Sequence, residues 1–441
     1  MIIDNLRAFY FLHKFNKSAY WSYKKLVDFQ NKQLRHVVKY AYDNVDFYHK
    51  LLREKGIRPS DIRDRNDLNR LPIIRKNMIR DNPRAFLSKQ FDPDKLRCLS
   101  TSGSTGNPMF IYVSPVEDML RKARHLRANT SCGQKIRDRW VIITSPKHFG
   151  TSTRLQRIFG FYVPTPVLVF SSVEEQISTI ENLNPDVLDG YSSSLLLLAK
   201  GVEAKGTDTI HPKFIIGGAE LIDDASKRFI EDVFGVPFFD QYACVEFDRI
   251  SWQCPEKVGY HMDSDSLILQ FMDDEETEVA RGEKGEIVCT SLFNYAMPLI
   301  RYAVGDIGKE SDEECSCGRK LPLMKVLEGR SDSNLVFPDG RIVSPRAITV
   351  AINMFPGYKF FDQFRIIQKK IDYFQILMKL KDLGADKKSL SSDFVEYLTT
   401  TLNLKSEKVI FDVDFVNEIP LISTGKFMIV SSELSKENLG N

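Results

Sequence analysis

Residues 186–220 contain DVLDGYS (186–192), SSLLLLAKGVEAKG (193–206) and KFIIGGAE (213–220), which are a strand-like run, a helix-like run and a second strand-like run. The strand-like runs are apolar, often β-branched, and end in small or polar residues. A strand, a helix and a strand in succession predict a βαβ unit in a sheet that helices cover. In such sheets ligands bind beyond the carboxyl ends of the strands.

The same alternation continues on both sides of this unit. Further strand-like runs are RWVIITSP (139–146), TPVLVF (165–170) and VPFFDQYA (236–243), and further helix-like runs are SVEEQISTIENL (172–183) and DDASKRFIEDVFG (223–235). After Tyr242 the pattern becomes β-rich: LILQFMD (267–273) and GEIVCTSL (285–292) flank an acidic segment that we interpret as a solvated hairpin connection. Upstream, residues 20–90 are predicted to be helical, with one helix ending at Gly56.

A chain of 441 residues exceeds the roughly 250–300 residues at which a single core stops growing, so we expect more than one domain. From Asp332 the composition shifts to a smaller unit with the strand-like runs FRIIQKK, YFQILMKL and VIFDVDFV and the helix-like run SLSSDFVEYLTTTLNL. The predicted fold class is therefore α/β. A large N-terminal domain (residues 1–330, helical over about 1–90) holds βαβ-type sheets and a β-rich part, and a small mobile α+β domain (331–441) follows.

Composition excludes several classes of protein. The formal charge of +2 argues against a broad nucleic-acid footprint, and no apolar run approaches 18 residues, so we expect no membrane span. The aromatic, basic residues 1–23 make a poor secretory signal and are better explained by a helix docked on the body, with a membrane-surface or partner-binding helix as the alternative. Seven scattered cysteines without an export signal predict a reducing, cytoplasmic location without disulfides.

The segment LSTSGSTGNPMFIY (99–112) combines glycines and hydroxyls between two strand-like stretches. Such a loop can direct backbone N–H groups and hydroxyls at a polyphosphate, because glycine lets the backbone approach closely. It is not the common nucleotide-binding loop, which needs Gly-Lys-Ser/Thr opening a helix. We therefore expect a loop that joins two strands and holds phosphate in another way.

Three further motifs follow this loop in order. QYACVE (241–246) places an aromatic residue and a carboxylate after a strand, RYAVGD (301–306) places a carboxylate in a glycine turn, and PLISTGKF (420–427) delivers a lysine from a glycine-containing turn. This order resembles that of the adenylate-forming enzymes, within the branch of phenylacetate–CoA ligases and CapK-like proteins. AYDNVDFYHKLLREKG, LDGYSSSLLLLAK, IIGGAEL, AMPLIRYAVGD and CSCGRK support that branch, over about residues 30–430.

The resemblance implies that the chain couples ATP and a small carboxylic acid, using Mg²⁺. It assigns Lys426 to the α-phosphate and the substrate carboxylate, Glu246 to Mg²⁺, Tyr242 to the adenine and Asp306 to the ribose hydroxyls. Arg330 contacts ribose or phosphate, and Asp332 is the hinge of the small domain. The residues expected to wrap the β- and γ-phosphates are Thr101, Ser102, Gly103, Ser104, Thr105 and Gly106. The wall between nucleotide and acyl group is expected to be Gly217, Gly218 and Ala219, with Glu220 beside them.

Two positions depart from the pattern of that family. Asn107 follows the last glycine of the loop, where the family often has lysine, and Val245 replaces a hydroxyl residue before Glu246. The first change is expected to weaken triphosphate contact, and the second removes a ligand to Mg²⁺ or phosphate. Both put the rate and the class of acyl acceptor in doubt, whereas Lys426, Glu246 and Asp306 are retained.

Four soft ligands are candidates for a second metal site. Cys315 and Cys317 lie in a tight turn beside Gly318, and Cys254 and His261 lie on a strand-like stretch upstream. This set fits a four-coordinate structural zinc site with no open position, although buried free thiols and a surface histidine explain the same residues. The other thiols lack partners at metal spacing and are expected to be packed: Cys98, Cys132, Cys244 and Cys289.

The sequence thus predicts adenylation of a carboxylic acid and transfer of its acyl group to a thiol, most simply coenzyme A. Two alternatives stay open: transfer to an amine or hydroxyl in capsule or surface-polysaccharide assembly, and a non-enzymatic scaffold that binds nucleotide. The aromatic stretch KHFGTSTRLQRIFGFY (147–162) points to an aryl or medium-sized acid, although a face buried in the core explains it equally well.

Overall fold

The computed structural model describes residues 2–100, 109–146, 154–219, 222, 224–328, 335–343, 345–381, 384, 386–404, 408–419 and 430–434. The α-helices are α1 (Ile2–Ser18), α2 (Tyr23–Asn44), α3 (Asp46–Glu54), α4 (Lys76–Asp81), α5 (Pro115–Ser131), α6 (Arg154–Phe159), α7 (Val173–Leu183), α8 (Ser192–Lys205), α9 (Asp224–Phe234), α10 (Pro345–Asn353) and α11 (Lys387–Thr401). Short 3-10 turns are η1 (Pro59–Asp61), η2 (Asn66–Arg70), η3 (Pro83–Phe86), η4 (Pro93–Lys95) and η6 (Pro356–Phe360).

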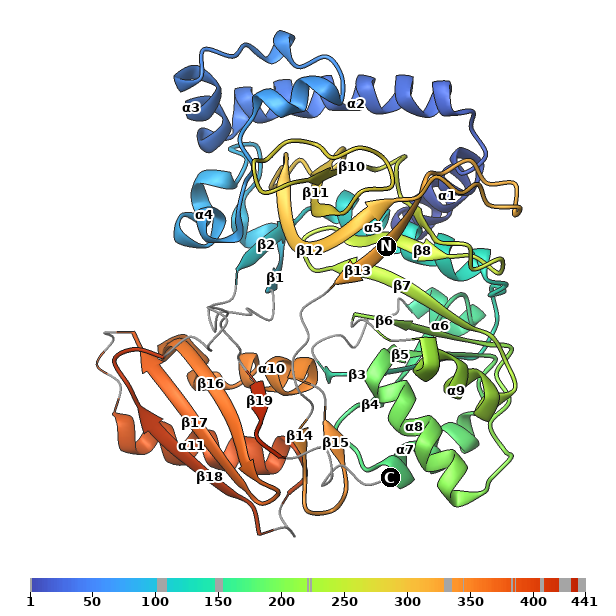
Figure 1. Cartoon of the computed structure of the whole chain (residues 1–441), viewed down its shortest axis with the longest axis vertical. Coiled ribbons are helices and arrows are strands. Elements are labelled where there is room, and N and C mark those ends of the chain that lie inside the picture. The colour runs from blue at the N-terminus through green and yellow to red at the C-terminus, as the bar shows by residue number, and fades with distance from the viewer. Residues whose placement is uncertain are drawn as a thin grey trace.

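The strands form one large sheet and three small ones (Figure 1). The eleven-stranded sheet has the order β10-β11-β12-β13-β9-β8-β7-β6-β5-β3-β4. Its strands are β3 (Trp140–Thr144), β4 (Pro164–Leu168), β5 (Val187–Tyr191), β6 (Phe214–Gly218), β7 (Phe238–Cys244), β8 (Asp248–Gln253), β9 (Tyr260–Met262), β10 (Leu267–Met272), β11 (Gly285–Ser291), β12 (Tyr302–Glu310) and β13 (Leu323–Glu328).

This sheet changes character at β7. The pairs from β4 to β7 are all parallel, and the pairs from β7 through β10 are all antiparallel. The predicted βαβ half and the β-rich half that follows it are thus two parts of one sheet, which confirms the α/β class. The acidic segment after β10 connects β10 to the antiparallel β11, as expected for a hairpin.

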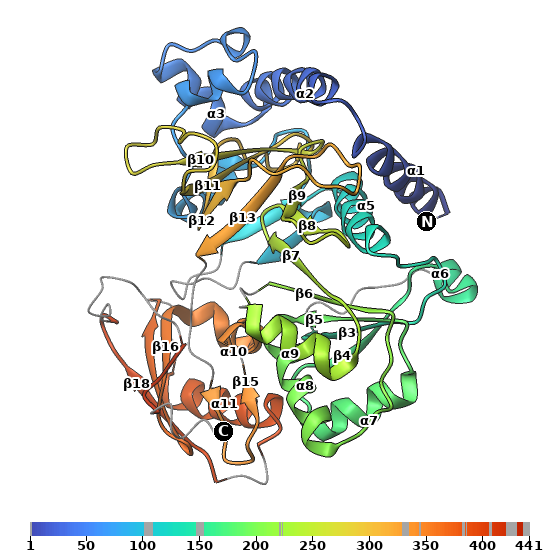
Figure 2. The same cartoon turned by 45° about the vertical axis from the view of Figure 1, so that its right-hand side comes forward.

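Helices cover both faces of the parallel half (Figures 1 and 2). Neighbouring residues of β6 belong to different apolar clusters, since Ile215 packs with α7–α9 and Ile216 packs with Trp140 and Leu126 of α5. Because side chains alternate along a strand, α5 lies on the face opposite α7–α9. On the antiparallel half, α2 and α3 supply Val37, Ala41 and their neighbours to a core with β10–β12.

The C-terminal part has its own sheet, with the order β18-β17-β16-β19. Its strands are β16 (Phe361–Lys370), β17 (Tyr373–Leu380), β18 (Ile410–Phe415) and β19 (Val430–Ser432), and the small pairs are β1 (Arg97–Ser100) with β2 (Phe110–Val113) and β14 (Leu335–Val336) with β15 (Ile342–Val343). Arg341 ties this part to the rest, because its guanidinium donates both to the Phe170 carbonyl that follows β4 (3.3 Å) and to the Leu402 carbonyl within the C-terminal part (2.6 Å). The predicted boundary near Arg330 lies outside the described residues and stays a prediction.

Two local predictions were wrong. Residues 20–90 are not helical throughout: after α3 the chain forms η1 and η2 before α4, since Gly56 and the prolines at 59, 72 and 83 interrupt helix hydrogen bonding. Asp306 does not lie in a turn but within β12, where Gly305 takes a φ of 90°. Within the part of the chain that is described, no helix has both the length and the apolar surface needed to cross a bilayer.

Candidate functional site

Two tyrosine–carboxylate pairs join β7 to β12. The Tyr242 hydroxyl of β7 donates to Asp306 Oδ2 of β12 at 2.7 Å, and the Tyr302 hydroxyl of β12 donates to Glu246 Oε1 at 2.8 Å. Glu246 lies in the turn that follows β7, and it is buried. The structure therefore brings the three described charged or aromatic candidates, Tyr242, Glu246 and Asp306, to one place, although β7 and β12 are not neighbours in the sheet.

The tyrosine and the two thiols beside these carboxylates are held in their neutral forms. Burial and the charge of Asp306 raise the pKa of Tyr242 far above its usual value, so its hydroxyl remains a donor. Burial and the charge of Glu246 likewise raise the pKa values of the Cys244 and Cys289 thiols. These thiols stay protonated near neutral pH, which disfavours a catalytic thiolate here.

Arginines of α5 donate hydrogen bonds to the backbone of the turn that carries Glu246. Arg121 donates to the carbonyls of Val245 (2.8 Å) and Glu246 (2.6 Å), and it pairs with Glu117 at 3.0 Å on the same helix. Arg124 donates to the carbonyl of Phe247 at 2.6 Å. These bonds satisfy carbonyls that the turn leaves without ladder partners, so the backbone under the Glu246 carboxylate is fixed.

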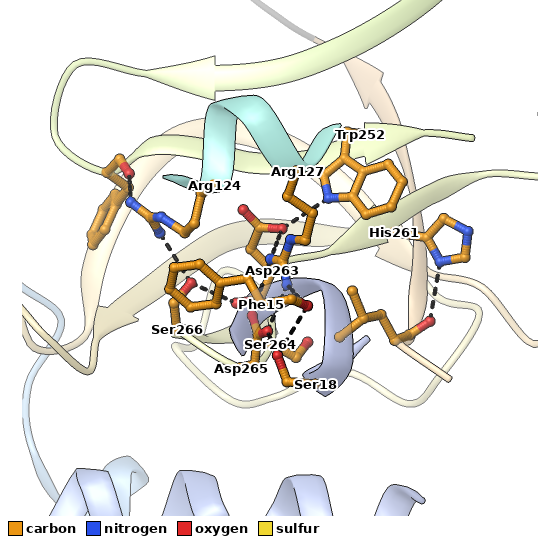
Figure 3. A network of polar contacts seen from close by, with 12 residues as sticks. Phe15, Ser18, Arg124, Arg127, Trp252, His261, Asp263, Ser264, Asp265 and Ser266 are labelled. Carbon is orange, nitrogen blue, oxygen red and sulfur yellow. Dashed lines mark hydrogen bonds and ion pairs between the residues drawn. The ribbon is translucent and has the colours of Figure 1, made fainter. Parts of the chain in front are cut away.

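The third arginine of the same face, Arg127, anchors α1 (Figure 3). Its fully buried guanidinium forms ion pairs with Asp263 and Asp265 and donates to the carbonyl of Phe15 at 3.2 Å. The Ser18 hydroxyl of α1 donates to Asp265, and Trp252 donates from Nε1 to Asp263 at 2.8 Å. The N-terminal helix is therefore docked on the body, as predicted.

The small residues at the end of β6 are required by close packing against β7. A Cβ added to Gly217 would lie 2.1 Å from Phe238 Cζ, and one added to Gly218 would lie 2.8 Å from the backbone oxygen of Gln241. Ala219 follows with a φ of 69°, a conformation that costs energy for a residue with a Cβ. Such strain at the carboxyl end of a parallel strand is typical of binding sites.

Several predicted site residues lie outside the described residues. They are Thr101, Ser102, Gly103, Ser104, Thr105, Gly106, Glu220, Arg330, Asp332 and Lys426. The strands that flank the glycine- and hydroxyl-rich loop are described. Residues Arg97–Ser100 pair antiparallel with Phe110–Val113, as expected for a loop that joins two strands.

The predicted soft ligands converge on one point. Cys254 follows β8, His261 lies on β9, and Cys315 and Cys317 lie between β12 and β13; their ligand atoms are all within 4.8 Å of one another. The sulfurs of Cys254 and Cys315 are 3.4 Å apart, and Cys317 Sγ is 3.4 Å from His261 Nε2. Tetrahedral bonds of about 2.3 Å to sulfur and about 2.0 Å to nitrogen give edges close to these lengths.

Hydrogen bonds around the cluster suit metal ligands. The sulfurs of Cys254, Cys315 and Cys317 accept from the backbone N–H groups of residues 256, 317 and 319, each two positions later. The Nδ1 atom of His261 lies 3.4 Å from the carbonyl of Leu321, which leaves Nε2 toward the sulfurs. None of the seven cysteines forms a disulfide; Cys132 and Cys289 are buried and Cys244 is half-buried, but Cys98 is exposed, so its predicted packing was wrong. Cys98 lies on β1 of the two-stranded β1–β2 sheet, where its side chain is exposed.

Sequence reasoning missed Tyr302 and the arginines of α5. Tyr302 lies four residues before Asp306. Nothing in the neighbouring sequence indicates that its hydroxyl donates a hydrogen bond to Glu246. Arg121, Arg124 and Arg127 recur at helical spacing, which indicates one face of a helix. Such a charged face is usually solvated, so only the tertiary structure shows that these guanidinium groups are buried against a turn.

The chain is similar in sequence to several known proteins. No family model matches the chain. It is 27% identical over 323 residues to a phenylacetate–coenzyme A ligase of Thermus thermophilus, covering 71% of this chain and 72% of the relative. It is 28% identical to a phenylacetate–coenzyme A ligase of Pseudomonas putida over 70% of this chain and 71% of the relative. It is 24% identical to protein CapK of Staphylococcus aureus over 91% of this chain and 88% of the relative.

The fold has solved counterparts. A crystal structure of 2-hydroxyisobutyryl-CoA ligase with 2-HIB-AMP and CoA superposes with a TM-score of 0.64 at 19% identity, covering 95% of this chain and 93% of that one. An open conformation of the same ligase gives a TM-score of 0.60 at 18% identity, over 91% and 90% of the chains. Together with the order of the motifs and the convergence of Tyr242, Glu246 and Asp306, these likenesses agree with the resemblance to the adenylate-forming superfamily, in the branch of the phenylacetate–CoA ligases and CapK.

Proposed function

We propose that this chain is an AMP-forming carboxylate ligase. One carboxylate oxygen of the acid attacks the α-phosphorus of ATP, the bond from that phosphorus to the bridging oxygen of the β-phosphate breaks, and pyrophosphate leaves. The product is an acyl-adenylate. The observation that carries this proposal is the meeting of Tyr242, Glu246 and Asp306 across two tyrosine–carboxylate hydrogen bonds.

The proposed role of each residue follows from the charges that the reaction brings together. Attack brings two anions together, so positive charge is needed where charge develops. Glu246 is a buried oxygen ligand on a fixed turn, which suits Mg²⁺, and that ion supplies charge neutralisation on the phosphates when bound. Asp306 is proposed to accept from the ribose hydroxyls and Tyr242 to lie against the adenine. Lys426 is proposed to act on the α-phosphate, with Arg330 beside the nucleotide.

The loop Thr101–Gly106 is proposed to donate to the β- and γ-phosphates. The end of β6, from Gly217 to Ala219, is proposed as the wall between nucleotide and acid, with Glu220 beside it. Gly217 and Gly218 leave no room for larger side chains against β7, which keeps this wall flat. These roles fit the chemistry of the side chains and follow the order of the motifs along the chain.

We propose coenzyme A as the acceptor, after rotation of the C-terminal part about Asp332. The thiol attacks the acyl carbon, the acyl–phosphate bond breaks, AMP leaves, and the thiol proton passes to solvent. The names of the ligase relatives support this acceptor. The proposed small carboxylic acid is aryl or medium-sized, and the seven cysteines, none of them in a disulfide, suit a reducing cytoplasm.

A second acceptor class is favoured by one observation. The match to CapK extends over 91% of this chain, whereas the match to the Thermus ligase extends over 71%. Transfer of the acyl group to an amine or hydroxyl, as in capsule or surface-polysaccharide assembly, is therefore the alternative. In that case the adenylation half-reaction is the same as for a CoA ligase. The nucleophile that attacks the acyl-adenylate is then an amine or hydroxyl instead of the thiol of coenzyme A.

Product analysis separates these alternatives. The purified chain is incubated with MgATP and a panel of acids, first alone, then with coenzyme A, and then with amines and sugar hydroxyls. AMP, pyrophosphate and a thioester are the expected products with coenzyme A. An amide or ester without a thioester favours the second acceptor class. A chain that binds ATP but forms neither pyrophosphate nor acyl-adenylate with any acid is a scaffold, and the proposal is then wrong.

We also propose that Cys254, His261, Cys315 and Cys317 bind a structural Zn²⁺. The donor set is three sulfurs and one imidazole, their spacing fits tetrahedral coordination, and backbone N–H groups support the sulfurs. Four protein ligands leave no position for substrate. The ion would join the β12–β13 connection to β8 and β9, on the segment that precedes the proposed hinge.

A further inference from the structure

We propose that one edge of the molecule, built by α1, α6 and the loop after α5, docks on an anionic lipid bilayer. The side chains that make this contact, called the α1–α6 surface below, are Arg7, Tyr10, Arg137, Arg157, Ile158 and Phe159. The inference does not rest on the proposed function, because none of these residues has a role in the adenylation chemistry given above.

Three segments that are far apart in the sequence pack together at this edge. Phe9 of α1 contacts the rings of Phe161 and Tyr162, with centroids 6.3 Å and 6.2 Å away. The Tyr162 N–H donates to the carbonyl of Ile136 at 2.8 Å, and the Arg137 guanidinium lies over the Phe161 ring at 5.9 Å. The first half of α1, the α6 region and the loop after α5 therefore form one surface, at the right-hand edge of Figure 2.

Large apolar side chains of this surface face solvent. Tyr10 is 61% exposed, Ile158 is 62% exposed and Phe159 is 49% exposed. The opposite face of α1 is already used, since Leu12 and Phe15 pack against α5. The helix is thus docked on the body through one face and still presents bulky side chains on the other. Exposed apolar side chains that gather in this way mark a contact with a second surface.

Positive charge gathers at the same edge. Residues 5–27 and 139–173 contain arginine and lysine but no aspartate or glutamate, although the whole chain has a formal charge of only +2. Arg7, Arg137 and Arg157 are exposed. The α1–α6 surface is therefore basic in a chain whose charges nearly balance, and its partner should be anionic.

Nearby acids do not cancel this charge. Asp138 is buried and pairs with Lys213 at 2.6 Å, and Asp186 pairs with Arg139 at 3.0 Å. Both carboxylates thus have cationic partners outside the α1–α6 surface.

The mixture of side chains favours a bilayer over other anionic partners. Arginine attracts anionic headgroups, tyrosine suits the headgroup level, and isoleucine and phenylalanine enter the boundary with the acyl chains. A nucleic acid or another soluble polyanion would use the arginines but leave Ile158 and Phe159 in water. A protein partner would need a complementary shape, whereas a bilayer adapts to side chains that project from an edge.

The apolar contribution is tested by sedimentation of the purified chain with lipid vesicles. The vesicles contain phosphatidylcholine alone or phosphatidylcholine mixed with phosphatidylglycerol, at about 0.1 M and about 1 M salt. The apolar variant is Ile158→Ser with Phe159→Ser. Its control is Ile371→Ser with Ile410→Ser, which changes two exposed apolar residues of the C-terminal sheet.

A second pair of variants tests the charge. Arg137→Gln with Arg157→Gln removes two positive charges from the α1–α6 surface. Arg53→Gln with Lys55→Gln removes two exposed positive charges at the end of α3, which lies away from α6 in both views (Figures 1 and 2). All changed side chains are exposed, so Tm should stay within a few degrees in every variant. Binding to heparin, a soluble polyanion, is measured in parallel.

We expect the unsubstituted chain and both controls to sediment with the mixed vesicles and not with phosphatidylcholine alone. The partition coefficient should fall at least tenfold in the charge variant, because each arginine near an anionic surface contributes about fivefold. It should also fall at least tenfold in the apolar variant, which loses two side chains that enter the bilayer. High salt should weaken binding of the unsubstituted chain at least tenfold.

Four outcomes would overturn the inference: no binding to either vesicle, equal binding to both, a variant that binds like its control, or binding that high salt leaves unchanged. Heparin binding without vesicle binding would assign the surface to a soluble acidic partner instead. Because the assay contains neither ATP nor an acid, its result is independent of whether the chain adenylates a carboxylic acid.

Discussion

Among single residues, Glu246 depends most closely on its neighbours. One carboxylate oxygen accepts from Tyr302, and the backbone carbonyl is held by Arg121. The carboxylate is thereby fixed in direction before any ligand arrives. Fixing a ligand in this way is the usual means by which proteins raise metal affinity and keep reacting groups aligned.

Replacing Tyr302 tests this dependence. In Tyr302→Phe, Glu246 loses its hydroxyl partner, so we expect the concentration of Mg²⁺ needed for half-maximal activity to rise about tenfold, as other losses of supporting hydrogen bonds at metal ligands do. The measurement is a Mg²⁺ titration of acyl-adenylate formation at saturating ATP. Tyr260→Phe is the matched control, because the Tyr260 hydroxyl makes a similar 2.7 Å bond to Asp240. An equal Mg²⁺ requirement in both variants would argue against a metal at Glu246.

Among the elements, α5 supports the site from one face. Arg121 and Arg124 are buried, and both donate to backbone carbonyls of the turn after β7. Arg121→Met leaves Glu117 buried without its partner, so we expect the free energy of unfolding to fall by about 3–5 kcal/mol. Chemical denaturation of the variant measures this loss.

Lys122→Met on the same helix provides the control. Lys122 pairs with Asp118 at 2.7 Å but keeps 57% of its side-chain surface exposed, so we expect a change below about 1 kcal/mol. Adding Glu117→Gln to Arg121→Met removes the unpaired charge and should restore part of the loss. Similar stability of both single variants would show that the buried network does not fix the turn.

The connection between β12 and β13 carries two ligands of the proposed zinc site, Cys315 and Cys317. We expect about one Zn²⁺ per chain in protein expressed with zinc, because the four ligands complete a tetrahedral set. Cys317→Ser should lose most of the metal and lower Tm by several degrees, since binding to the folded state alone stabilises it. Elemental analysis and calorimetry test this, with Cys98→Ser as the exposed-thiol control. A full complement of zinc in Cys317→Ser would contradict the assignment.

Elements with strong local signals could be predicted from the sequence. Runs such as FIIGG and VLDGY are apolar, β-branched and end in small residues, and they form β6 and β5. The stretch after Gly56 was predicted poorly, because its apolar residues have helical spacing while prolines interrupt it into 3-10 turns and the short helix α4. The strand position of Asp306 was hidden by Gly305, which reads as a turn but lies within β12 where the pairing with β11 shifts register.

For the molecule as a whole, the site depends on segments far apart in the sequence. Tyr242 and Asp306 could be predicted because each lies in a motif of recognisable order. The partners Tyr302 and Arg121 could not, because their roles arise from contacts across the sheet and α5 that no local pattern encodes. Sequence motifs thus identify the residues of the site, and only the tertiary structure shows which side chains hold them in position.

The contribution of the C-terminal part is tested through the two half-reactions. Lys426→Ala should lower acyl-adenylate formation at least a hundredfold, because it removes positive charge from the phosphate that is attacked. Thioester formation from a supplied acyl-adenylate and coenzyme A should change less than threefold, since Lys426 is proposed to leave the site for that step. Lys388→Ala, an exposed lysine of α11, is the control. Equal losses in both half-reactions would contradict this division of work.

The central claim is that Glu246 and Asp306 serve one nucleotide while an acid is adenylated. Acid-dependent exchange of labelled pyrophosphate into ATP, compared between the unsubstituted chain and Glu246→Gln, tests it most directly. We predict exchange in the unsubstituted chain with at least one acid and a loss of at least a hundredfold in Glu246→Gln, with Tm unchanged within a few degrees. Exchange that Glu246→Gln leaves intact, or no exchange with any acid in the unsubstituted chain, would contradict the account.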